Sequence, residues 1–204
     1  MTRGKFIVLE GGDGVGKTTQ VKLLADWLTR QRIEHVVTRQ PGGTRLGNRL
    51  RELVLDPATG EVALRAEALI YAADKAQHVM EVVEPALRRG LVVVSDRFID
   101  SMIAYQGAGR GVDVDEIEKL ALWATGGLRP DLTLLLDAHP GDAMARLTSK
   151  DRLEQAGDAF HAQVREYYLQ LAHEGGEGYS IIDSQDTPQR VSANIIERVS
   201  QLLG

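Results

Sequence analysis

The sequence predicts an α/β fold in which helices cover both faces of a five-stranded parallel sheet. Five short runs are rich in Val, Ile and Leu and almost continuously apolar, which is typical of strands buried on both faces of a parallel sheet. Segments with helical periodicity lie between these runs. Such an alternation of strands and helices along one chain is typical of a doubly wound α/β sheet.

Each element can be assigned from its local pattern. The predicted strands are residues 5–10, 34–39, 91–96, 132–137 and 179–183. Between the first two, residues 17–32 repeat their apolar positions at helical spacing, with Leu24 and Leu28 on one side. The long segment 63–88 is also predicted as helical. Its Pro85 lacks a backbone donor and should kink the helix or restart it.

The second half of the chain contains three further predicted helices. Asp113 begins the helix at 114–124, and a glutamate three residues after it completes a capping box. The next helix is predicted at 158–173. Thr187 caps the last, at 188–203, which has a proline in its first turn.

Composition limits what the protein can do. The 204 residues contain no linker or repeat, so a single domain, 1–204, is expected. A net charge of −5 argues against a general nucleic-acid binder, because such proteins carry basic binding faces. The chain has no cysteine, which excludes disulfides and fits a reducing compartment. No signal peptide or membrane-spanning run is apparent, so we expect a cytoplasmic protein without a membrane or nucleic-acid partner.

Three glycine-rich segments stand out. Two of them, 41–47 and 107–111, are the longest irregular stretches and are expected to be binding loops. The third follows the first strand and opens a helix, and it has the spacing of a phosphate-binding P-loop. Its backbone donors and the helix N-terminus would bind phosphate oxygens, Lys17 would reach the β- and γ-phosphates, and the Thr18 hydroxyl would ligate Mg²⁺. The expected nucleotide-binding residues are Gly11, Gly12, Asp13, Gly14, Val15, Gly16, Lys17, Thr18 and Thr19.

Two strands end in an aspartate that could orient Mg²⁺. Asp96 is followed directly by Arg97, a cation that could bind a second phosphate, whereas Asp137 can equally be a strand-end residue or a helix cap. We therefore expect Asp96 to be the metal ligand. Arg39 and Arg51 each resemble solvated surface charges, but with Arg97 they could form one phosphate site, because guanidinium groups bind oxyanions in bidentate fashion.

Four segments in order along the chain carry a closer resemblance. They are the P-loop at 11–19, TRQPGGT at 38–44, DRFIDS followed by AYQG at 96–107, and RPDLTLLLD at 129–137, with weaker matches at 69–78 and 151–155. In these segments the chain resembles the bacterial thymidylate kinases. The resemblance implies a P-loop kinase fold and transfer of the γ-phosphoryl group of ATP to dTMP with Mg²⁺, giving dTDP and ADP. It also implies a homodimer, since the family commonly pairs through helices.

The resemblance implies a role for each residue of an acceptor site. Arginines would bind the phosphate of dTMP, Asp13 would reach the sugar hydroxyl, Tyr71 would stack on thymine, and Gln106 would lie near base and sugar. A lone tyrosine on a helix is otherwise more often an ordinary core residue. The implied substrate-binding residues are Asp13, Arg39, Arg51, Tyr71, Lys75, Arg97, Met102, Tyr105 and Gln106.

Several positions depart from the family pattern. Gln40 replaces the usual glutamate of TRxPGG, Lys75 stands where an arginine usually contacts a thymine carbonyl, and Met102 stands where a small polar residue usually faces the pyrimidine. The P-loop carries no arginine at its variable positions, which implies that a short lid, 146–155, supplies the catalytic cation. Arg152 is the expected residue, with Lys150 and Arg146 as alternatives. The expected catalytic residues are Lys17, Asp96, Arg97 and Arg152.

Two other functions remain open at this point. A P-loop kinase with a different acceptor would explain the altered base-site residues. A nucleotide-hydrolysing regulator that binds a protein partner is the third hypothesis. A GTPase would be expected to carry an NKxD-like motif, which the chain lacks, and several arginines at an acceptor site fit a kinase better than a switch.

Overall fold

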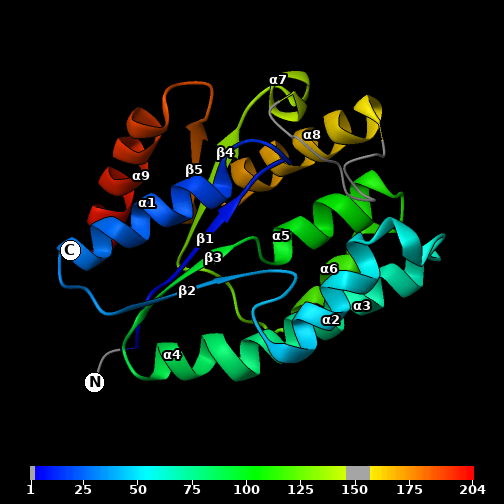
Figure 1. Ribbon diagram of the computed structural model, residues 1–204, viewed down its shortest axis with the longest axis horizontal. Helices are drawn as coiled ribbons and strands as arrows, with labels where there is room; N and C mark the ends of the chain where they lie inside the picture. Colours follow the sequence, from blue (N-terminus) through cyan, green and yellow to red (C-terminus); the bar gives the residue numbers. More distant parts are fainter. Residues whose placement is uncertain (1–2, 146–156) are drawn as a thin grey trace.

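A computed structural model describes residues 3–145 and 157–204. Its five strands form one parallel sheet in the order β2-β3-β1-β4-β5, as expected for a doubly wound α/β fold (Figure 1). The strands are β1 (Phe6–Glu10), β2 (His35–Arg39), β3 (Val92–Asp96), β4 (Leu132–Asp137) and β5 (Tyr179–Asp183). All five lie within the predicted ranges, so the predicted fold class is confirmed.

Helices cover both faces of this sheet. One face packs against α1 and α9, and the other against α3, α4, α5, α6 and α8 (Figure 1). Alternate side chains of β1 pack on opposite faces of the sheet. Phe6 and Val8 belong to one apolar cluster, and Ile7 and Leu9 belong to the other. The α-helices are α1 (Lys17–Arg30), α2 (Arg45–Leu55), α3 (Leu64–His78), α4 (Glu84–Arg88), α5 (Ile99–Met102), α6 (Val114–Ala124), α7 (Pro140–Met144), α8 (Asp158–Glu174) and α9 (Pro188–Leu203).

Short helical segments of other kinds occur among residues 3–145 and 157–204. Two are 3₁₀ turns and two are π-helical, and both π-helical segments continue an α-helix. The segment η2 joins α3 to α4 and ends two residues before Pro85, so a wider turn accommodates the proline within the predicted long helix. These segments are η1 (Pro57–Thr59), η2 (Val79–Val83), η3 (Ile103–Gly109) and η4 (Gly176–Gly178).

The expectation of a binding loop at 107–111 is wrong for most of that stretch. The helix that begins with α5 continues as η3 through Gly109. The glycines there allow close packing between helices: a Cβ on Gly109 would lie 2.6 Å from the ring of Phe160 on α8, and one on Gly107 would lie 3.3 Å from Val114 of α6. The segment 41–47 leaves β2 as an irregular loop, and α2 begins within it at Arg45.

The sheet order brings the functional segments together. The carboxyl ends of parallel strands share one edge, where ligands of doubly wound sheets bind. The P-loop follows β1, the 40–44 loop follows β2, and Arg97 follows β3 at this edge. In the part of the chain described here, none of the helices has the length and apolar character needed to cross a membrane.

Candidate active site

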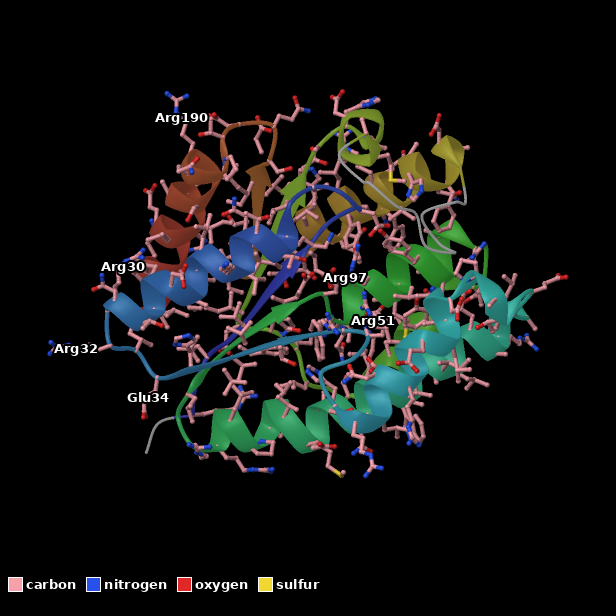
Figure 2. All side chains as sticks on the ribbon, in the orientation of Figure 1. Arg30, Arg32, Glu34, Arg51, Arg97 and Arg190 are labelled. Atoms are coloured by element: carbon pink, nitrogen blue, oxygen red, sulfur yellow. The ribbon has the colours of Figure 1, made fainter. Side chains whose placement is uncertain are left out.

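A cleft of about 870 Å³ opens at the carboxyl edge of the sheet. This volume is within the range of small-molecule sites. Figure 2 shows Arg51 and Arg97 near the centre of the molecule, whereas Arg30, Arg32 and Arg190 point outward. All the expected substrate-binding residues line the cleft, together with most of the P-loop: Asp13, Gly14, Gly16, Lys17, Thr18, Thr19, Arg39, Arg51, Tyr71, Lys75, Arg97, Met102, Tyr105 and Gln106.

The remaining P-loop residues lie behind the cleft. Gly11, Gly12 and Val15 line a small cavity between the loop, α7 and α8. A Cβ at Gly14 would lie 2.0 Å from the carbonyl oxygen of Ala143, and Gly14 has a φ of 75°, so this position requires glycine for both space and backbone angle. The loop can therefore pass close to α7 and turn into α1.

The Lys17 ammonium lies against the P-loop. Its Nζ donates to the carbonyl oxygen of Gly11 at 3.0 Å and to that of Gly12, and the side chain is buried. Burial, together with the charge of Arg97, lowers the pKa of Lys17 to about 8. The lysine is thus held by its own loop, at the position where the sequence predicts phosphate binding.

The structure distinguishes the two aspartates that could orient a metal. Thr18 Oγ1 donates to Asp96 Oδ2 at 2.8 Å, so a hydroxyl and a carboxylate lie together at the start of α1. Asp137 instead accepts two hydrogen bonds from Arg165, at 2.7 and 2.8 Å, which occupy both carboxylate oxygens. Oxygen donors of this kind fit Mg²⁺, which takes its other ligands from phosphates and water. The geometry therefore favours Asp96 over Asp137.

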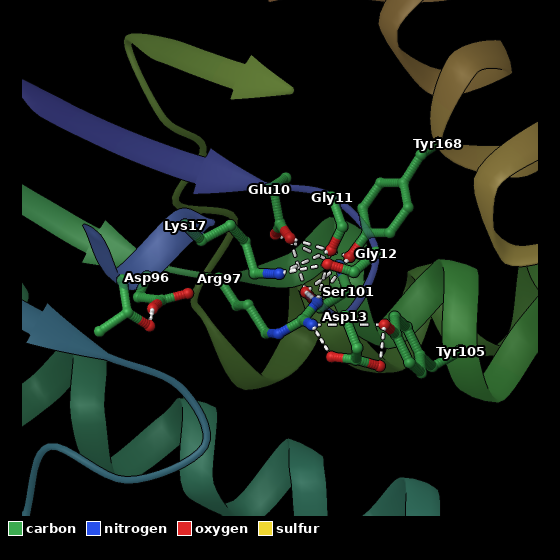
Figure 3. Close-up of polar contacts among 11 residues, drawn as sticks. Glu10, Gly11, Gly12, Asp13, Lys17, Asp96, Arg97, Ser101, Tyr105 and Tyr168 are labelled. Carbon is green, nitrogen blue, oxygen red and sulfur yellow. Dashed lines mark hydrogen bonds and ion pairs between the residues drawn. The ribbon is translucent and has the colours of Figure 1, made fainter. Parts of the chain in front are cut away.

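The Arg97 guanidinium is the centre of a polar cluster (Figure 3). It donates to the carbonyl oxygen of Gly11 at 3.0 Å, to Tyr105 Oη at 3.3 Å, and to an Asp13 oxygen in an ion pair. Burial alone would raise the pKa of Asp13, but the charges of Arg97 and Lys17 and the Tyr105 hydroxyl lower it below its ordinary value. Arg97 and Asp13 therefore form a charged pair that hydrogen bonds hold in place.

Sequence reasoning did not identify three members of this cluster as site residues. Glu10, buried at the end of β1, accepts from the backbone N–H of Phe98 at 2.7 Å and from Tyr168 Oη at 3.0 Å. Ser101 Oγ donates to the same carboxylate at 2.5 Å and accepts from Arg97 at 3.1 Å. A charged residue at the end of a buried strand is a sequence signal for Glu10. No local pattern marks Tyr168, which reaches the cluster from α8.

The other end of the cleft contains the residues expected to contact the base. Tyr71, Met102 and Gln106 are all buried, and the Gln106 amide donates to Glu67 at 3.1 Å. Lys75 is 2% exposed and its Nζ donates to Gln40 Oε1 at 3.2 Å, so two positions that depart from the family pattern contact each other.

Two of the arginines expected to bind the acceptor phosphate differ in how they are held. Arg51 Nη1 donates to the carbonyl oxygen of Pro41 at 3.0 Å, which ties α2 to the 40–44 loop. Arg39 is exposed at the end of β2. The expected lid, 146–155, with Arg146, Lys150 and Arg152, lies outside the described residues.

Comparisons with known proteins agree on one family. A family model described as thymidylate kinase matches residues 9–195. A thymidylate kinase of Cutibacterium acnes is 54% identical over 200 residues, covering 98% of each chain. A thymidylate kinase of Clavibacter michiganensis subsp. michiganensis is 50% identical over 204 residues, covering 98% of this chain and 96% of the relative. A thymidylate kinase of Leifsonia xyli subsp. xyli is 52% identical over 196 residues, covering 94% and 92%.

Proposed function

The chain belongs to the thymidylate kinase family and transfers the γ-phosphoryl group of ATP to dTMP, giving dTDP and ADP, and we propose that the cleft at the carboxyl edge of the sheet performs this transfer. One observation carries the assignment. The P-loop lysine and the acceptor-side arginine, Lys17 and Arg97, both donate to the carbonyl oxygen of Gly11. A donor phosphate site and an acceptor phosphate site built on these two cations would be adjacent, as direct transfer requires.

On the donor side, the P-loop binds the phosphates of ATP. Its backbone N–H groups and the N-terminus of α1 attract phosphate oxygens, and Lys17 stabilises the charge that develops during transfer. Thr18 and Asp96 would hold Mg²⁺, which when bound neutralises charge on the phosphate oxygens. The hydrogen bond between these two side chains supports this pairing.

On the acceptor side, Arg97, Arg39 and Arg51 bind the phosphate of dTMP. Asp13 and Tyr105, which share a hydrogen bond of 2.7 Å, accept and donate near the sugar hydroxyl. The charge of Arg97 keeps Asp13 ionised, so Asp13 serves as an acceptor. These contacts hold the attacking phosphate oxygen in line with the γ-phosphorus.

At the base, Tyr71 stacks on thymine while Lys75, Met102 and Gln106 surround its edge. Their shared position in the lining of one cleft supports this arrangement. The lid cation, with Arg152 as the first choice, stabilises the transferring group. If Arg152→Ala lowers kcat more than it raises either KM, this role is supported; if only Lys150→Ala or Arg146→Ala does so, the role belongs to that residue.

The acceptor preference is tested by an assay of ADP release. Purified enzyme is given ATP and Mg²⁺ with dTMP, dUMP, dCMP, dGMP and dAMP in turn, with a control lacking any acceptor. We expect the highest kcat/KM with dTMP, slow release without acceptor, and loss of activity on removal of divalent metal. A faster reaction with another monophosphate would favour the alternative of a kinase with a different acceptor.

We further propose that the chain forms one domain and acts as a cytoplasmic homodimer. The substrates ATP and dTMP and the absence of cysteine are in keeping with a cytoplasmic location. Three leucines on the neighbouring helices α2 and α3 support self-association, because they are apolar and 45–58% exposed: Leu46, Leu53 and Leu69.

A further inference from the structure

A chain of buried hydrogen bonds lies behind the base-contacting end of the cleft. Lys75 Nζ donates to Gln40 Oε1 at 3.2 Å, Gln40 Nε2 contacts His78 Nδ1 at 2.9 Å, and His78 Nε2 contacts Thr38 Oγ1 at 2.6 Å. Lys75, Gln40 and His78 are each at most 2% exposed. These hydrogen bonds connect one turn of α3 to the end of β2 and the start of the 40–44 loop.

The chemistry of the groups fixes the direction of each bond. An amide nitrogen only donates, so His78 Nδ1 must accept from Gln40, and the imidazole is the neutral tautomer with its hydrogen on Nε2. That hydrogen is donated to the Thr38 hydroxyl. Burial, reinforced by the charge of Lys75, lowers the pKa of His78 to about 4, which keeps the ring neutral near pH 7.

The Lys75 ammonium determines the orientation of the Gln40 amide. An ammonium only donates, so the amide oxygen must face Lys75, and the amide NH₂ is left to donate to His78 Nδ1. A flipped amide would set its NH₂ against the ammonium, donor against donor. His78 therefore acts on Lys75 through Gln40, because by accepting from the NH₂ group it anchors the amide with its oxygen toward the ammonium.

This arrangement depends on a neutral residue at position 40. A glutamate, the usual residue in the family pattern, would supply a charge to Lys75 but could not donate to His78. With glutamine, Lys75 is oriented by an amide oxygen, and the acidic group with the largest electrostatic effect on its pKa is Asp74 on the same helix. Among the described residues, Gln40 is the one side chain that accepts a hydrogen bond from Lys75. Lys75 is also one of the residues that line the cleft.

We propose that His78 and Gln40 are positioning residues for base selection, holding the Lys75 ammonium at the pyrimidine edge where thymine carries a carbonyl and cytosine an amino group. The inference rests on the proposed contact of Lys75 with the base. An ammonium donates to the C4 carbonyl of dTMP and meets only hydrogens on the C4 amino group of dCMP. The hydrogen bonds from Thr38 to Lys75 thus help the enzyme to distinguish the C4 carbonyl of dTMP from the C4 amino group of dCMP.

The test compares kcat/KM for dTMP with kcat/KM for dCMP. The ratio is independent of the fraction of folded enzyme, because both values scale with the same active concentration. We expect His78→Leu and Gln40→Leu each to lower the ratio about tenfold, the scale of one hydrogen-bonding partner lost in a buried site, with KM for ATP unchanged. His78→Asn should retain most of the ratio, since its amide oxygen can accept from Gln40.

Three further variants make the test specific. Gln77→Ala, one residue before His78 and bonded to Glu81 at the surface, is the matched control and should leave the ratio unchanged. Lys75→Met should lower the ratio at least as much as His78→Leu. In the double variant His78→Leu with Gln40→Leu, the ratio should fall no further than in Gln40→Leu alone, since residues acting through one contact are not additive.

The outcomes distinguish the contact of Lys75 with the base from the positioning of Lys75 by His78 and Gln40. If Lys75→Met leaves the ratio unchanged, the proposed contact of Lys75 with the base is wrong, and the inference falls with it. If Lys75→Met lowers the ratio while His78→Leu and Gln40→Leu do not, Lys75 reads the base without help and the positioning inference alone is overturned. Additive losses in the double variant would overturn it as well.

Discussion

At the scale of single residues, Arg97 occupies an unusual backbone conformation. Its φ is 70°, a left-handed value that costs a non-glycine residue roughly 1–3 kcal/mol. Three hydrogen bonds hold this turn: Arg97 N–H to Leu9 O at 2.9 Å, Ser95 Oγ to Arg97 O at 2.8 Å, and Phe98 N–H to Glu10 at 2.7 Å. The turn redirects the chain at the end of β3, so that the guanidinium meets the P-loop.

The fixed position of the Arg97 side chain predicts that Arg97 and Arg39 contribute unequally to dTMP binding. Arg97→Ala and Arg39→Ala should both weaken dTMP binding more than ATP binding. Arg97→Ala should have the larger effect, because its side chain is only 15% exposed and is already oriented by hydrogen bonds. One charged hydrogen bond is worth about 1.5–3 kcal/mol, which corresponds to a loss of roughly tenfold to a hundredfold. Calorimetric titration with each ligand measures this. Unchanged dTMP affinity in both variants would exclude these residues from the acceptor site.

A second residue-scale prediction concerns the P-loop lysine. Lys17→Ala should lower kcat on the order of 10²-fold or more, since a preorganised charge acts on the transferring phosphate. Lys22→Ala, an exposed lysine on the same helix, serves as the control and should retain activity. Circular dichroism and thermal unfolding establish that both variants fold. Near-normal turnover by folded Lys17→Ala would refute the role given to this residue.

At the scale of elements, the helix that follows β3 determines how α8 meets the cleft. The π-helical segment η3 presents Gly109 to Phe160 of α8, and Tyr168 of the same helix reaches the Glu10 carboxylate. The aromatic rings of Tyr105 and Phe160 pack edge to face with centroids 5.8 Å apart. Close approach of these two helices therefore brings Tyr168 to Arg97.

The role of Gly109 in this packing can be tested by adding a methyl group. Gly109→Ala should lower the free energy of unfolding by about 1–3 kcal/mol, the usual effect of overpacking, because its Cβ would lie 2.6 Å from the Phe160 ring. Gly178→Ala is the control, since no heavy atom lies within 4 Å of a Cβ there. Urea unfolding gives both values. Equal stability of the two variants would mean that α8 moves aside at no cost.

At the scale of the whole molecule, the order β2-β3-β1-β4-β5 explains why one cleft contains every expected acceptor residue. The central strand β1 pairs with β3 on one side and β4 on the other, so the P-loop lies between the segments that follow them. Apolar clusters on both faces fix the sheet, and the binding residues extend from its edge. The expected site residues come from the P-loop and from the strand ends and helices that meet at this edge.

The proposed homodimer is the whole-molecule prediction. Leu53→Asp on α2 should shift the protein toward monomer, because a charge in an apolar interface is costly to bury. Arg190→Asp on the remote helix α9, also a change to aspartate at an exposed position, is the control. Light scattering coupled to gel filtration measures the mass of each. A monomeric wild type would contradict the proposal, and an unchanged dimer in Leu53→Asp would place the interface elsewhere.

Local patterns in the sequence were enough to predict the fold and the P-loop. Strands and helices follow from the period of apolar residues over a few positions, and caps such as Asp113, which accepts from the Glu116 N–H at 2.9 Å, act within one turn. The P-loop is equally local, because glycines, Lys17 and Thr18 act within one continuous turn. The phosphate site of three arginines was predicted from guanidinium chemistry, whereas the roles at the sugar and the base came from the family resemblance, and all of them stay predictions.

The tertiary structure alone decided which distant side chains meet. Glu10 and Tyr168 are 158 residues apart in sequence yet hydrogen-bonded, and Gln40 and His78 are 38 apart. The glycines near 107–111 suggested a loop, but the packing of α8 on η3 uses them as helical contact points. Such contacts depend on how whole elements pack. The apolar period or turn preference of one segment does not specify which side chains of another element will contact it.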